Sequence, residues 1–231
     1  MLKIINKNKE KILNVLTKPY VVVLVLLFAP LLSYFDRNFS FFFGLAIVLL
    51  ILKTSNYNWS LFGFKKITKQ TILKSFLFSF VLLIVDICIS LIVQNYFGEP
   101  NLSSLEDIKH NTVGFIVILI VVWTLVAFGE EFLFRGYYIK WLAKTFGNTK
   151  FAWILSILII STYFSLSHYY QGISGVISIF FISLIISFLY LKNKDNLGLF
   201  VLIHGISDTY GLSLIYLDIE DPISGWILQM F

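Results

Sequence analysis

The sequence predicts an all-α polytopic integral membrane protein, a helical bundle of about seven transmembrane helices with a range of six to eight. Composition is the first observation, because 58% of the 231 residues are hydrophobic and 13% are charged, which is far more apolar than a soluble domain. Segment length is the second. Several apolar runs reach the roughly 17–25 residues that a spanning helix needs, and they lack the alternation of barrel strands.

The chain is expected to form one membrane domain. Residues 1–111 would hold the N-terminal membrane helices and Lys-rich cytoplasmic segments, 112–217 a helical core with the polar motifs, and 218–231 a short tail at the outer interface. The first apolar run contains Pro30 and no small-x-small cleavage site follows it, so we expect a retained helix and not a signal peptide. Helices are expected at 20–35, 40–52, 73–97, 112–145, 151–168, 173–191 and 197–217.

The basic residues predict the orientation. With the N-terminus in the cytoplasm, 16 of the 18 basic residues fall in cytoplasmic segments, and only Arg37 and Lys109 lie outside. This distribution explains the net charge of +5 through topology, so the lipid bilayer is the expected partner and nucleic acid is not. Cys88 is the sole cysteine, which excludes a disulfide framework.

Glu130 to Arg135 reads Glu-Glu-Phe-Leu-Phe-Arg and ends a long apolar run. Ionisable groups at membrane depth are costly and usually mark function. Adjacent residues on an α-helix point about 100° apart, so we expect only one of the two carboxylates to face a site directly. Arg135 lies four residues after Glu131 and shares its face, which predicts a structural ion pair and leaves Glu130 for chemistry.

Two later apolar segments carry imidazoles, His168 in Phe-x-x-x-His and His204 in His-x-x-x-Asp. If the helix 112–145 turns at Gly147-Asn148, Glu130 and His168 both stand about 25 Å from that turn. His204 and Asp208 are one helical turn apart and share a face. The four side chains are therefore expected to meet inside the bundle, nearer the cytoplasmic side.

Two chemistries fit this set of residues. Glu130 and His168 could deprotonate a water while His204 and Asp208 organise hydrogen bonds around an oxyanion. Alternatively, Glu130, His168 and His204 could be the three protein ligands of a catalytic zinc ion. Spacing does not separate the two, and no cofactor is required by the first. Asp86, in the middle of another apolar helix, is expected to be a structural polar group.

Together, the patterns E-E-x-x-x-R, F-x-x-x-H and H-x-x-x-[N/D] resemble the CPBP family of intramembrane proteases, the type II CAAX protease and bacteriocin-processing group, from about Val113 to Leu212. The resemblance implies that 112–217 is a catalytic core in which Glu130 and His168 activate water and His204 with residue 208 forms the oxyanion site. Glu131, Arg135 and Phe164 would be supporting residues. Asp208 stands where the family often has Asn, and an Asp must be protonated to donate a hydrogen bond.

The resemblance thus implies an intramembrane endopeptidase, glutamate-dependent or metal-dependent, acting on a peptide or protein in the membrane, with the bacterial plasma membrane as its location. A non-enzymatic bacteriocin self-immunity or membrane interaction protein with the same architecture is the alternative. An ion-coupled transporter that relays protons through Glu130, His168 and Asp208 is a third reading. It predicts an internal repeat or paired broken helices, and the sequence indicates neither.

Overall fold

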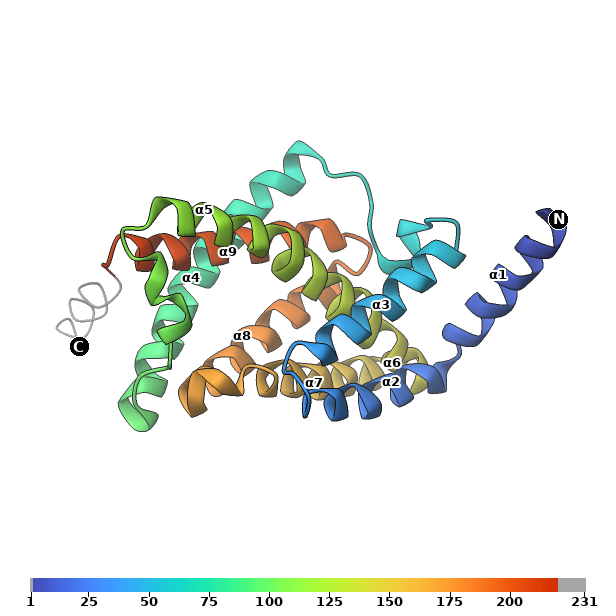
Figure 1. Cartoon of the computed structure of the whole chain (residues 1–231), viewed down its shortest axis with the longest axis horizontal. Coiled ribbons are helices and arrows are strands. Elements are labelled where there is room, and N and C mark those ends of the chain that lie inside the picture. The colour runs from blue at the N-terminus through green and yellow to red at the C-terminus, as the bar shows by residue number, and fades with distance from the viewer. Residues whose placement is uncertain (1, 220–231) are drawn as a thin grey trace. The chain divides into compact units, whose positions relative to one another are not determined.

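The computed structural model describes residues 2–219, and side chains from residue 8 onward. The predicted tail, 218–231, therefore lies outside the described residues from position 220. The all-α membrane fold is confirmed, since no strand occurs in the described part of the chain. The elements seen in Figure 1 that match the predicted helices are α2 (Pro19–Leu32), α3 (Phe39–Thr54), α4 (Lys69–Phe97), α5 (Thr112–Val121) continued by η3 (Val122–Ile139) and α6 (Lys140–Thr145), α7 (Lys150–Leu166), α8 (Gly172–Lys192) and α9 (Leu197–Tyr216).

Two kinds of element were not predicted. The Lys-rich N-terminus forms an additional helix, α1 (Leu2–Leu16), and three short 3-10 turns occur in the connections: η1 (Trp59–Phe62), η2 (Ser103–Ile108) and η4 (Tyr169–Gln171). In addition, η3 is a π-helix of 18 residues within the segment that was expected to be one α-helix.

Four segments are long and apolar enough to cross a membrane: Lys69–Phe97, Thr112–Thr145, Tyr169–Lys192 and Leu197–Tyr216. A fifth results if the bent pair Asn8–Leu16 and Pro19–Leu32 counts as one span. The predicted number of seven is not confirmed. The apolar helices α3 and α7 have 16 and 17 residues, and at 1.5 Å per residue they rise about 24–26 Å, which is less than a hydrocarbon core of about 30 Å.

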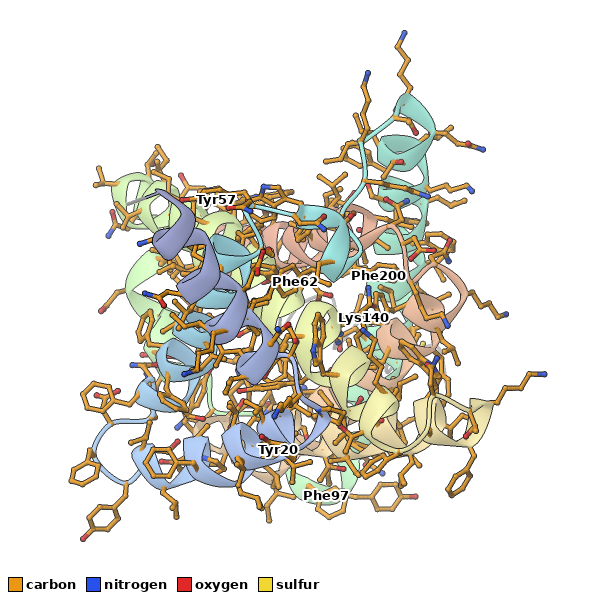
Figure 2. All side chains as sticks on the ribbon, turned by 90° about the vertical axis from the view of Figure 1, so that its right-hand side faces the viewer. Tyr20, Tyr57, Phe62, Phe97, Lys140 and Phe200 are labelled. Carbon is orange, nitrogen blue, oxygen red and sulfur yellow. The ribbon has the colours of Figure 1, made fainter. Side chains whose placement is uncertain are left out.

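The described chain divides into two compact units. Unit 1 contains 1–65, 132–160 and 190–197, and its centre is aromatic: the ring of Phe62 lies 4.7 Å from that of Phe132 and 5.6 Å from that of Trp141. Lys140 Nζ donates a hydrogen bond of 2.9 Å to the carbonyl oxygen of Leu61, beside Phe62 (Figure 2). Phe62 is fully buried.

A glycine is required next to this aromatic cluster. Gly63 has a φ of +93°, and a Cβ atom there would meet the carbonyl oxygen of Lys194. The carbonyl oxygen of Gly63 also accepts a hydrogen bond of 2.8 Å from the backbone N–H of Leu197. The turn predicted at Gly147-Asn148 is confirmed within the same unit, with φ values of +92° and +57° between α6 and α7.

Within the described residues, unit 2 contains 66–131, 161–189 and 198–219. Its helix α9 is held from two sides: Ser79 Oγ on α4 donates 3.0 Å to the carbonyl oxygen of Ile203, and the indole N–H of Trp123 donates 3.2 Å to Thr209 Oγ1. At the end of α9, Lys109 Nζ lies 2.7 Å from Asp218 Oδ1. The hydrogen bond and charge of Lys109 lower the pKa of the exposed Asp218 carboxyl. These contacts fix α9 and its two polar site residues within unit 2.

Candidate active site

The site is assembled within unit 2, and both of its adjacent carboxylates come from the π-helix η3. In a π-helix each N–H bonds to the carbonyl five residues earlier, so a turn holds more residues than in an α-helix. Successive side chains therefore turn through less than 100°. Such stretches are rare and are usually a single turn at functional positions. Here the π register extends over 18 residues and includes Glu130 and Glu131.

Glu131 contacts His204 and holds its imidazole ring in place. Its Oε1 atom lies 3.0 Å from His204 Nδ1, and the Glu131 side chain is 0% exposed. A buried carboxylate needs a partner of this kind, because an unpaired charge away from water is strongly unfavourable. The contact fixes the ring orientation of His204 and makes Nδ1 the donor toward the carboxylate.

The other ring nitrogen of His204 faces two carboxyl groups. Nε2 lies 3.8 Å from Oε2 of Glu130 and 3.4 Å from Oδ2 of Asp208, one helical turn along α9. The expectation that only one of the adjacent glutamates could approach the site directly is therefore wrong. Both approach the same imidazole, one at each nitrogen, and the narrower angle between neighbours in a π-helix is the physical reason.

The side chains of Glu130 and Glu131 differ in their exposure to solvent. The Glu130 side chain is 15% exposed and that of Asp208 is 31% exposed, whereas Glu131 is fully enclosed. A water molecule or a substrate can reach the first two groups but not the third.

His168 follows α7 directly and is half-buried. Its Nδ1 atom lies 2.9 Å from the carbonyl oxygen of Phe164, so Nδ1 carries a proton and Nε2 holds the free lone pair of the neutral ring. The ring of Phe164 is buried and lies 4.8 Å from the imidazole. Phe164 therefore supports His168 with both its ring and its backbone, and the Phe-x-x-x-His spacing corresponds to this i, i+4 contact.

Arg135 is 2% exposed and lies in the part of η3 that belongs to unit 1. Its predicted ion pair with Glu131 stays a prediction. The contact between Glu131 and His204 was not predicted, and two adjacent glutamates give no sequence signal that would assign it.

Asp86 on α4 is a further carboxylate of unit 2. It was expected to be a structural polar group in the middle of an apolar helix, and this stays a prediction.

The described residues contain no group of three or more His, Cys, Asp or Glu side chains placed to hold a metal ion. Three ligands about 2.0–2.2 Å from one point would be needed for a catalytic zinc site. The set Glu130, His168 and His204 does not fit such a site in this arrangement, so no step is derived through zinc. The zinc alternative stays a prediction for metal analysis.

Carboxylate and imidazole side chains thus meet on helices of an integral membrane protein. Residues 112–210, just under half of the chain, match the family model described as Rce1-like, Type II CAAX prenyl endopeptidase. The match is consistent with the resemblance to CPBP-family intramembrane proteases and supports intramembrane endopeptidase activity in general. It includes Glu130, His168, His204 and Asp208. The comparisons with curated proteins and with solved structures each found no match.

Proposed function

We propose that the protein hydrolyses a peptide bond of a membrane-associated peptide or protein, using a water activated by Glu130 and His168 and an oxyanion site formed by His204 and Asp208. The observation that supports this most directly is the arrangement around His204: a buried carboxylate at Nδ1 and two accessible carboxyl groups at Nε2. Nδ1 of the imidazole is thereby held by Glu131, and Nε2 is left for chemistry.

Glu130 is the proposed base that receives a proton from the water. It is the accessible member of the glutamate pair, so water can approach its carboxylate, whereas Glu131 is enclosed. His168 is the proposed partner, because its Nδ1 proton is bound to the carbonyl of Phe164 and its Nε2 lone pair can accept a hydrogen bond from the same water. General acid–base catalysis of this kind typically contributes about 10²–10⁴-fold in rate.

His204 and Asp208 would stabilise the negative charge that develops on the carbonyl oxygen when water attacks. Nδ1–H of His204 is directed to Glu131, so Nε2 can donate only when the ring is an imidazolium. Asp208, 3.4 Å from Nε2, can donate only when it is protonated. A donor aimed at the developing oxyanion is worth about 10²–10³-fold in kcat.

The orientation is proposed on the charge distribution, with the N-terminus and the loops 56–69 and 192–196 in the cytoplasm and 98–111 outside. This places 16 of 18 basic residues on the cytoplasmic side.

The decisive experiment is cleavage of a membrane-inserted peptide by purified protein in nanodiscs, with prenylated and unprenylated versions assayed in parallel. We expect Glu130→Gln to reduce turnover by at least about 10²-fold. Glu106→Gln, a carboxylate of the outer connection, is the matched control and should retain full turnover. Wild-type turnover by Glu130→Gln would overturn the assignment. Protection of cells against a bacteriocin that survives Glu130→Gln would favour the immunity alternative.

A further inference from the structure

The chain changes direction sharply between the N-terminal helix α1 and the next helix, α2 (Figure 1). The axes of Asn8–Leu16 and Pro19–Leu32 meet at 69°. Pro19, at the start of α2, explains the break, because proline has no N–H and drives the residue before it out of the helical region. Lys18 accordingly has an extended backbone, with φ −67° and ψ 140°.

The two helices differ in their content of charged residues. The 14 residues of α2 contain no charged side chain, whereas Lys9, Glu10 and Lys11 lie in the last part of α1 and Lys18 follows it. Charged groups in the hydrocarbon are costly, so α1 does not continue the span. If α2 enters the bilayer, a bend of 69° directs α1 along the membrane surface.

The outward side of α1 is apolar in part. Ile12 and Val15 are 42% and 46% exposed and lie three residues apart, so they are neighbours on the helix surface. Leu13 and Leu16 are half-buried where α1 packs against α2 and α3, and Lys9 Nζ lies 3.4 Å from Asn56 Oδ1. Contacts within unit 1 therefore use one side of the helix and leave Ile12 and Val15 accessible.

Basic residues accompany this apolar pair. The first eighteen residues contain five lysines and one acidic residue. Lys11 is exposed next to Ile12, and Lys18, also exposed, lies with its ammonium 5.7 Å from the ring of Tyr20, a residue that Figure 2 shows at the start of α2. A helix with an apolar side and lysines beside it is the type that lies in the headgroup region of anionic membranes.

We propose that α1 is an interfacial helix that binds anionic phospholipid headgroups of the bilayer crossed by the protein. Ile12 and Val15 enter the boundary between headgroups and acyl chains, and Lys11 and Lys18 contact the phosphates. The occupant of this surface is lipid and not a protein partner, because its apolar pair lies beside α2, whose 14 residues carry no charge, and because its lysines are complementary to anionic headgroups.

The test uses the full-length chain with Cys88→Ser and a single cysteine, Ile12→Cys, in nanodiscs. The membrane-impermeant maleimide reaction rate is compared in phosphatidylcholine and in phosphatidylcholine with phosphatidylglycerol. We expect the rate at position 12 to fall at least about fivefold with the anionic lipid. Glu10→Cys, on the polar side of the same helix, is the matched control and should change less than about twofold. Equal rates at position 12 in both lipids would overturn the proposal.

A second variant tests the lysines. In the Ile12→Cys background, Lys11→Gln with Lys18→Gln should restore rapid labelling in anionic nanodiscs, whereas Lys74→Gln on α4 should not. Thermal unfolding of each variant shows whether the fold is intact. Continued protection of position 12 in the folded double variant would refute a role for anionic headgroups.

Discussion

Oε1 of Glu131 lies 3.0 Å from Nδ1 of His204, and this contact joins the π-helix η3 to α9 inside unit 2. It gives the buried glutamate a structural function and leaves Nε2 of the same ring toward Glu130 and Asp208. The two adjacent glutamates can therefore be distinguished by substitution.

Glu131→Gln should destabilise the protein, because it removes a buried charge from its hydrogen-bonding partner. Breaking a buried pair costs on the order of 3–5 kcal/mol. Glu130→Gln should leave the melting temperature nearly unchanged while turnover is lost, since its side chain is partly solvated. Thermal unfolding and cleavage assays on both variants check this. The same loss of stability in both would contradict the division of roles.

The pH–rate profile reports the role of Asp208. If Asp208 donates to the oxyanion, activity requires the protonated carboxyl, so it is present at low pH and falls as pH rises through the pKa of this group. Asp208→Asn supplies a donor at every pH and should keep the activity while removing this alkaline decline. A folded Asp208→Asn enzyme without activity would show instead that Asp208 orients His204 through a charge.

Gly205 should not tolerate a methyl group. A Cβ atom there would lie 2.7 Å from the indole ring of Trp123, which is itself held by its hydrogen bond to Thr209. Gly205→Ala should lower the free energy of unfolding by about 1–3 kcal/mol through overpacking, and it should impair turnover because His204 is adjacent.

Gly211→Ala is the matched control for this substitution. It lies on the same helix, and a Cβ atom there meets no atom within 4 Å. It should be neutral or stabilise by up to about 1 kcal/mol, because alanine favours a helix over glycine. Thermal unfolding in detergent compares the two. Equal behaviour would show that the close approach of Trp123 to α9 is not maintained.

Removal of metal ions should leave activity intact, because the described residues contain no group of three His, Cys, Asp or Glu side chains placed to hold a metal ion. The measurement is cleavage after dialysis against a chelator, together with elemental analysis of the purified protein. Stoichiometric zinc, with activity lost on chelation and restored by zinc, would establish the metal-dependent alternative.

Labelling of single cysteines tests the orientation. In a Cys88→Ser background, Ser104→Cys between α4 and α5 should react with an impermeant reagent from outside the cell. Asn193→Cys, after α8, should react only after the membrane is permeabilised. Reaction of position 104 from the inside alone would reverse the topology that the 16 to 2 division of basic residues predicts.

Most helices could be predicted because a spanning helix is defined by the length of its apolar run. The predicted range 112–145 coincides with the combined segment Thr112–Thr145. The π register inside it could not be predicted, since the same apolar residues fit either hydrogen-bonding pattern. α1 was missed because its lysines and asparagines obscure a helical pattern in which apolar residues lie mainly on one side.

The site was predicted in part. Sequence motifs singled out His204 and Asp208, and the structure places Nε2 of His204 near Glu130 and near Asp208. The contact between Glu131 and His204 could not be deduced, because it joins residues 73 positions apart and depends on how two helices are packed.

The π-helix makes the number of residues before Glu130 as important as their identity. Deleting one residue between Val122 and Glu130 without a change of hydrogen-bond register would turn the residues that follow by one residue's rotation, somewhat less than about 100°, relative to those before. Conservative replacements in this stretch keep the carboxylates pointing at His204, whereas a single insertion or deletion rotates them away. For protein engineering, the segment therefore accepts changes of side chain far more readily than changes of length.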